Sequence, residues 1–231
     1  MKKSLVASLV KSIGVEASGI AGEFLEIGID SLCDEGLLRD IPFVSTVASV
    51  FHIGQTIRDR HSILKLAAFI EEINHSIINE DELEKYKTKI ETDEKIRNNE
   101  LSHLLILIDR YVGIDRPRML AKLYLAYLRN DLQWAELVSY AEVVDRLLPN
   151  DCKLLTDSDV KGVDYQEVDS GYLRLSALGL MVDYGKNTAF NLGSFSVVGG
   201  NRKNYALTEF GAKLIRILEI TKVDIVCNVS E

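Results

Sequence analysis

The sequence predicts a mainly α-helical chain that ends in a small α+β module. Apolar residues recur at helical spacing through most of the first 148 of its 231 residues. The remainder alternates short apolar runs with glycines and other turn formers, as strands and tight turns do. With 47% hydrophobic and 27% charged residues, the chain has the composition of a protein that buries a core. We therefore expect three regions: glycine-dotted apolar helices over residues 1–56, a helical bundle over 57–148 and the α+β module over 149–231.

The first region is predicted to form two helices. One spans Ser4 to Gly36 and contains four internal glycines, each of which weakens an exposed helix by about 1 kcal/mol relative to alanine. The other begins at Ile41, with Asp40 as a candidate N-cap. Pro42 then falls in the first turn, where its missing N–H group is tolerated.

Five carboxylates lie along one side of the first predicted helix: Glu16, Glu23, Glu26, Asp30 and Asp34. At 100° per residue they fall within a sector of about 80°. An acidic stripe of this kind is the solvated face of an amphipathic helix in one interpretation. In the other it lines water inside an oligomer, because carboxylate rings are one way in which cation pores are built.

No charged side chain occurs between Asp40 and Arg58, counting histidine as neutral. The seventeen residues from 41 to 57 would form a helix of about 25 Å, slightly shorter than the ~30 Å hydrocarbon core of a bilayer. A buried core helix and a membrane-inserting or re-entrant helix both fit, because small and hydroxylated residues favour close helix packing in either setting. In the second interpretation Arg58, Arg60 and Lys65 contact lipid headgroups. The candidate pore and membrane residues are Glu23, Glu26, Asp30, Phe43, Val47, Ser49, Val50 and His52.

The middle region is predicted to be a helical bundle. Leucine-rich stretches such as HSILKLAAFIEEIN place their apolar residues on one stripe. Gly113 is expected to end one helix, and Pro149 is expected to end the last one. Asp115 and Asp131 are expected to cap the two helices that lie between these positions.

Metal, disulfide and catalytic chemistry have no support in the residue pattern. The three cysteines, Cys33, Cys152 and Cys227, are far apart and form no C-x-x-C pair. No two histidines stand at the i, i+4 spacing of a helical metal site. The sequence also contains no nucleophile elbow, P-loop, H-E-x-x-H motif or dinucleotide fingerprint. We therefore expect no metal, no cofactor and no enzymatic activity.

The last region has the residue order of a helix, a strand, a turn-rich hairpin, a second strand and a helix. SGYLRLSALGLMVDYG predicts a short helix, a turn at Gly179 and a strand from Leu180 to Tyr184. YALTEFGAKLIRILEI predicts a strand, an N-cap at Thr208 and an amphipathic helix. This order, with the segments ALGLM and YALTEFGAKL, resembles a winged-helix module.

The charge of this winged-helix-like module argues against duplex DNA as its main ligand. Residues 151–219 hold eight Lys or Arg and nine Asp or Glu. A duplex-binding domain normally has a basic surface, because phosphate contacts dominate its affinity. The candidate recognition helix holds a single cation, Arg174, and the whole chain carries a net charge of −8. We therefore favour a protein contact.

A second interpretation of the module is a site for a small ligand. Tyrosines lie near cations in this part of the sequence, and that combination can bind a single-stranded oligonucleotide by stacking and charge. The opposite interpretation, which we favour residue by residue, is that the tyrosines are core side chains. The candidate ligand-binding residues are Tyr172, Arg174, Arg202, Lys203 and Tyr205.

One segment resembles small bacterial proteins from abortive-infection and anti-phage loci: LRDIPFVSTVASVFHIGQTIRDRHSILKLAAFIEEI. The matched residues are Ile41, Pro42, Ile57, Arg58, Asp59, Arg60, Lys65, Leu66 and Phe69. The whole layout is similar in plan to the membrane effector of Hailong-type defence. The resemblance implies a homo-oligomer, such as a tetramer, in the inner membrane with most of the chain on the cytoplasmic side. It also implies an inactive state held by a single-stranded DNA oligomer from a partner nucleotidyltransferase.

Two functions are compatible with these patterns. The first is an antiviral effector of bacteria that oligomerises, contacts membrane lipid and permeabilises the inner membrane as an ion channel, with a ligand or partner protein holding it inactive. The alternative is a cytoplasmic winged-helix transcription regulator or adaptor.

Overall fold

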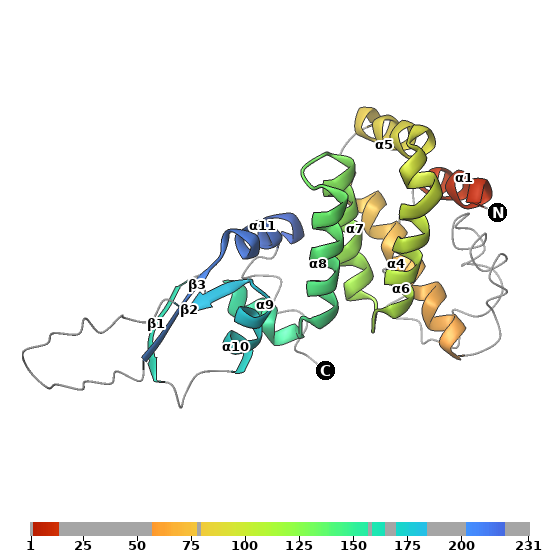
Figure 1. The fold of residues 1–231 in the computed structure, drawn as a ribbon. Helices are drawn as coiled ribbons and strands as arrows, with labels where there is room; N and C mark the ends of the chain where they lie inside the picture. The colour runs from red at the N-terminus through yellow and green to blue at the C-terminus, as the bar shows by residue number, and fades with distance from the viewer. Residues whose placement is uncertain are drawn as a thin grey trace, which may run out of the picture. The chain divides into compact units, whose positions relative to one another are not determined.

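The computed structural model describes residues 2–13, 57–77, 80–156, 159–164, 170–183 and 202–219. The chain divides into two compact units, Met1–Asp145 and Arg146–Glu231, called below the helical unit and the C-terminal unit. The described residues are mainly helical, with a small antiparallel sheet in the C-terminal unit (Figure 1). The predicted fold class is confirmed at this level.

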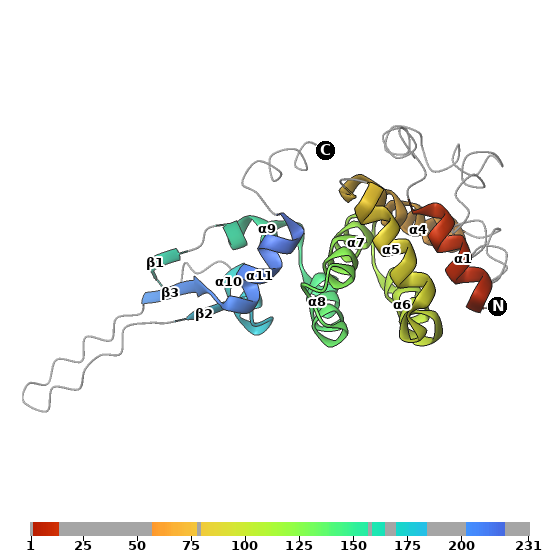
Figure 2. The same cartoon turned by 90° about the horizontal axis from the view of Figure 1, so that it is seen from above.

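The helical unit consists of helices alone in its described residues. In chain order they are α1 (Lys2–Ser12), α4 (Ile57–Ser76), α5 (Glu80–Thr92), the π-helical segment η3 (Ile96–Glu100), α6 (Leu101–Arg110), α7 (Asp115–Leu128) and α8 (Trp134–Arg146). Helix α4 packs against both α6 and α7, while α1 packs against α5 and η3 (Figures 1 and 2).

The core of the helical unit follows the apolar stripe that the sequence predicts for α4. Leu66, Phe69, Ile70 and Ile73 are buried, at the spacing that one face of a helix requires. The facing residues of α7 are also buried, and the ring of Phe69 lies 6.0 Å from that of Tyr124. Burial of these side chains stabilises the unit by roughly 1.5–3 kcal/mol for each large apolar residue.

Two lysines complete the ends of neighbouring helices. The last carbonyls of a helix have no partner within it, so another group must bind them when they are buried. From α4, Lys65 Nζ donates to the carbonyl oxygens of Asp109 and Tyr111, at 2.5 and 3.1 Å. From α5, Lys89 Nζ donates to those of Tyr127 and Leu128, at 3.2 and 3.1 Å. Lys65 is therefore a buried structural residue, and the lipid-headgroup contact predicted for it is wrong.

In the part of the chain that the structure describes, none of the helices combines the length and the apolar character needed to cross a membrane. This finding overturns the predicted inner-membrane location. The longest described helix, α4, has 20 residues and so reaches about 30 Å, but charges interrupt it. Its charged residues are Arg58, Asp59, Arg60, Lys65, Glu71 and Glu72. The predicted pore and membrane residues, Glu23, Glu26, Asp30, Phe43, Val47, Ser49, Val50 and His52, lie outside the described residues.

The C-terminal unit combines a three-stranded sheet with helices. Its elements are α9 (Pro149–Thr156), β1 (Asp159–Asp164), α10 (Ser170–Ala177), β2 (Met181–Asp183), β3 (Arg202–Leu207) and α11 (Glu209–Leu218). The strand order is β1-β3-β2, with both pairs antiparallel (Figure 1). In the register of the second pair, Met181 lies opposite Leu207. Helix α9 packs against α10, and α10 packs against β2.

Local signals in the C-terminal unit place α11 against the turn before β2. The predicted cap is confirmed, because the Thr208 hydroxyl accepts the N–H of Gly211 at 3.0 Å. The same hydroxyl donates to the carbonyl of Gly179 at 2.6 Å. Gly179 has φ +75°, as the predicted turn requires. A Cβ on Gly211 would lie 2.2 Å from the carbonyl oxygen of Leu180, so this position admits only glycine.

Two predicted helix caps in the bundle are wrong by a few residues. Asp115 is the first residue of α7, and Ile114 occupies the N-cap without a side-chain hydrogen bond. Helix α8 begins at Trp134, and the Glu136 carboxylate accepts the N–H of Gln133 at 2.8 Å, so Asp131 is not its cap. The helix before Pro149 does end ahead of it, at Arg146, and Pro149 itself begins α9, because proline is well suited to a first turn.

Candidate functional site

The Arg174 guanidinium, predicted to bind a ligand, forms a two-pronged ion pair with Asp151. The Nη2 atom donates to Oδ1 at 2.6 Å, and Nε donates to Oδ2 at 3.1 Å. Asp151 is fully buried in α9, and its Oδ2 also accepts the N–H of Leu148 at 2.8 Å. Planar guanidinium and carboxylate groups match in this geometry, which makes the pair stronger than a single contact.

The ion pair satisfies much of the charge of Arg174 inside the unit. The arginine side chain remains 36% exposed, while the carboxylate is 0% exposed. Contact of this guanidinium with a phosphate would compete with Asp151 and would leave a buried carboxylate less well compensated, at a cost of several kcal/mol. The ion pair thus reduces the free energy that Arg174 would contribute by contacting a phosphate.

The two tyrosines of the predicted ligand site are core residues. Tyr172 and Tyr205 are both buried, and their rings stack at a centroid distance of 5.2 Å with 15° between the planes. The structure therefore brings these two predicted residues together, but as partners of one another. A base cannot stack on rings that are already covered, so the arrangement favours the core interpretation of the tyrosines.

The last two predicted ligand residues lie on β3. Arg202 is paired in register with Asp164, and Lys203 with Val163. Their side chains fall outside the described part of the chain. Of the five predicted ligand residues, three therefore have described side chains, and all three engage other groups of the C-terminal unit.

The outer face of α10 carries exposed apolar residues that the sequence reasoning missed. Leu173 is 49% exposed, and Ala177, one turn later, is also exposed. Val182 on the adjoining β2 is 48% exposed. The helical period of SGYLRLSA could have revealed this patch. Tyr172 and Leu175 lie on the buried side of the helix, so Leu173 must lie on another side, away from the core.

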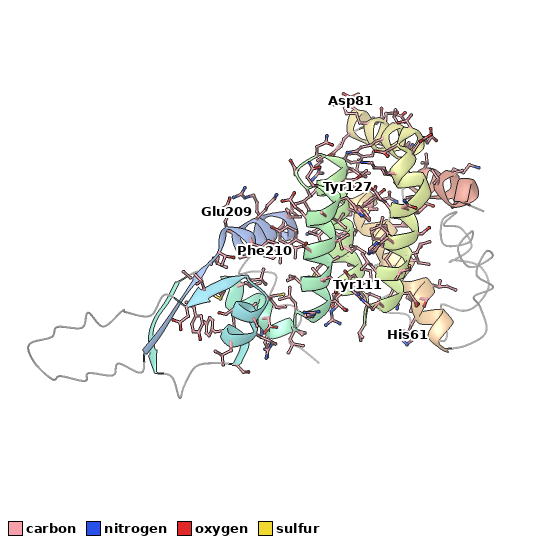
Figure 3. All side chains as sticks on the ribbon, viewed as in Figure 1. His61, Asp81, Tyr111, Tyr127, Glu209 and Phe210 are labelled. Atoms are coloured by element: carbon pink, nitrogen blue, oxygen red, sulfur yellow. The ribbon has the colours of Figure 1, made fainter. Side chains whose placement is uncertain are left out.

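The helical unit contains a second feature, the Glu100 cluster, made of Lys89, Glu100, Tyr127 and Trp134. Glu100 is 4% exposed, and its carboxyl group accepts the Tyr127 hydroxyl at 2.8 Å. Burial raises the pKa of Glu100, and the nearby Asp93 adds to this effect, while the hydrogen bond from Tyr127 opposes it. Lys89 Nζ lies 5.0 Å from the Tyr127 ring centroid, and the Trp134 ring lies at 5.5 Å. Figure 3 shows Tyr127 near α5, away from Tyr111, which precedes α7.

The described residues offer no candidate metal site. Within the described ranges, no group of three or more His, Cys, Asp or Glu residues could hold a metal ion. Of the histidines considered in the sequence, His103 packs edge-on against Trp134 at 5.8 Å, which fits a structural role.

Comparisons with protein-family models, curated proteins and solved structures give no match. The resemblance to abortive-infection proteins therefore stays a prediction. Three of the residues that carry it, Lys65, Leu66 and Phe69, are buried in the helical unit. Packing alone is sufficient to explain these three positions.

Proposed function

We propose that the chain is an adaptor whose C-terminal unit is a winged-helix-like module that binds protein, namely a second copy of the same chain. The observation that carries the proposal is the surface of α10. Its only basic residue, Arg174, is paired with Asp151, and Leu173 beside it is half exposed.

The order of elements supports the winged-helix-like assignment. Helix α10, strands β2 and β3 and helix α11 follow one another, and the two strands are antiparallel. In such modules the helix that corresponds to α10 is the one that enters a DNA groove. Here that helix presents Ser170, Leu173 and Ala177 to solvent. Apolar groups at this position suit a protein surface, whereas phosphates require cations.

The distribution of charge supports a second copy as the partner. Residues 151–219 hold eight basic and nine acidic residues, a net charge of −1. The chain as a whole carries −8, so the remaining residues carry −8 − (−1) = −7. Two copies that meet through the nearly neutral module avoid the repulsion between their acidic parts. An isologous contact also needs only one apolar patch, because the same patch serves both copies.

Two predicted functions receive less support. Permeabilisation of the inner membrane required a location that the described helices contradict, so it is not carried forward. Binding of a single-stranded DNA oligomer required stacking surfaces, and the rings of Tyr172 and Tyr205 are buried against each other.

The first test measures self-association of the full-length chain. We expect light scattering after size exclusion to give a mass above that of the 25.9 kDa monomer. Leu173→Glu should shift the mass towards the monomer, because it places a charge in the apolar patch. Ile106→Glu is the matched control, since Ile106 is an exposed apolar residue of the helical unit.

The second test is a titration with labelled duplex DNA at low salt. Affinity that comes from phosphate contacts falls steeply as the salt concentration rises. We expect no duplex binding of this salt-dependent kind. If duplex binding depends on salt and is lost in Arg202→Ala, the chain is a DNA-binding regulator and the proposed adaptor function is wrong. If the wild-type chain is a monomer, the proposal that its partner is a second copy of the same chain is wrong.

A further inference from the structure

A buried carboxyl group that forms no ion pair with any described side chain distinguishes the Glu100 cluster from the other acidic sites of the helical unit. Glu71, Glu72, Glu82, Glu142 and Asp145 each form an ion pair with a lysine or arginine. Glu100 forms no ion pair with a described residue, and its hydrogen bond comes from the neutral Tyr127 hydroxyl. A buried carboxylate without a cation is costly, so such groups take up a proton instead.

The backbone at Glu100 is also unusual. Residues Ile96–Glu100 form the π-helical segment η3, which leads directly into α6. The N–H of Leu101 donates to the carbonyl of Ile96, the wider ring that defines a π-helix. π-Helical segments are rare, and many of those that occur lie at functional sites. Glu100 thus lies in a segment whose backbone hydrogen bonds depart from the α-helical pattern.

The charged and titratable groups around Glu100 come from every element packed on η3. Asp93 raises the pKa of Glu100, while Lys95 and Lys89 lower it. Helix α6 contributes His103, which packs on Trp134. Helix α7 contributes the hydroxyls of Tyr124 and Tyr127. The only charged side chain described on α1 is Lys11, which is exposed.

We propose that the buried Glu100 carboxyl is a proton-operated latch: η3 stays packed against α7 while the carboxyl is neutral and loosens when it is ionised. The neutral acid can accept the Tyr127 hydroxyl without a cation. The ionised acid requires water, and η3 must open to admit it. The segment that opens also contains Ile96, which is fully buried, so the response reaches the core beneath α5.

The direction of the response follows from proton linkage. The pKa of Glu100 lies above its ordinary 4.5 in the closed state, so the closed state binds a proton that the open state has released. Stability of the closed state is therefore complete below pH 4.5 and is lost as the pH rises through the raised pKa. The opening constant grows by about tenfold for each pH unit that separates the two pKa values.

Amide hydrogen exchange in the full-length chain tests the latch. We expect exchange at η3, corrected for the intrinsic rate at each pH, to become faster between pH 4.5 and 7.5 in the wild type. In Glu100→Gln the corrected rate should not change with pH, because the amide accepts the Tyr127 hydroxyl but does not titrate. Glu91→Gln is the control, since Glu91 is an exposed residue of α5. It should retain the wild-type response.

Tyr127→Phe separates the latch from a simple loss of packing. The tyrosine hydroxyl lowers the pKa of Glu100, so its removal should move the exchange midpoint to higher pH while the response remains. The fluorescence of Trp134, the one tryptophan of the chain, gives an independent midpoint, because its ring contacts Tyr127. The proposal is overturned if Glu100→Gln keeps the wild-type pH response, or if Tyr127→Phe moves the midpoint downward.

Discussion

Replacing Arg174 with alanine distinguishes a structural arginine from a nucleic-acid contact. The variant leaves the Asp151 carboxylate fully buried, with the N–H of Leu148 still donating to it. Breaking a buried ion pair by removing one partner costs about 3–5 kcal/mol. The Arg174 side chain is 36% exposed, so water can partly replace it, and we expect a loss of about 2–3 kcal/mol.

Hydrogen exchange at the amides of β3 and α11 is the appropriate assay for this variant. Trp134 lies in the helical unit, so its fluorescence does not report on the C-terminal unit. A double-mutant cycle adds Asp151→Asn, which removes the charge and still accepts the Leu148 N–H. We expect Arg174→Ala to cost much less in that background, because no buried charge is left behind. Unchanged exchange in Arg174→Ala, together with weaker duplex binding, would refute the reasoning and would return the arginine to a DNA-contacting role.

Three further substitutions test the packing around the two sites. Gly211→Ala should destabilise the C-terminal unit by about 3 kcal/mol or more, measured by exchange at α11, because its Cβ would meet the Leu180 carbonyl at 2.2 Å; wild-type protection would contradict this. Lys89→Met should destabilise the helical unit by about 1–2 kcal/mol in urea unfolding followed by Trp134 fluorescence, because the Leu128 carbonyl loses the Lys89 donor and the Tyr127 carbonyl keeps the N–H of Asn130. Thr208→Ala should cost about 1 kcal/mol through loss of the α11 cap, whereas Thr208→Ser should cost little.

The features of the fold that depend on neighbouring residues could be predicted from the sequence. Thr208 lies three residues before Gly211, and the cap between them was expected and is present. Gly179 stands at a turn that needs positive φ, which its residue type indicated. The apolar stripe of α4 likewise predicted the buried side of that helix. These features depend on residues within a turn or two of one another, so the sequence exposes them directly.

The candidate site depends on distant partners, and the sequence does not indicate these. Arg174 meets a carboxylate 23 positions earlier, on a helix that was not predicted. Lys65 binds carbonyls 44 and 46 positions away, so a residue expected at lipid headgroups is buried. The tyrosines near the predicted ligand site could equally be exposed or buried until their strand and helix are packed together. Tertiary packing decides whether each charge and ring faces solvent or the core.

Exchange of subunits between labelled populations tests the central claim most directly. Full-length chains that carry a donor or an acceptor dye at the N-terminus are mixed, and energy transfer between the dyes is followed over time. If two copies meet through α10, energy transfer should occur in the wild type and in Ile106→Glu and should be lost in Leu173→Glu. Transfer of equal strength in Leu173→Glu, or no transfer in the wild type, would contradict a contact between two copies through α10.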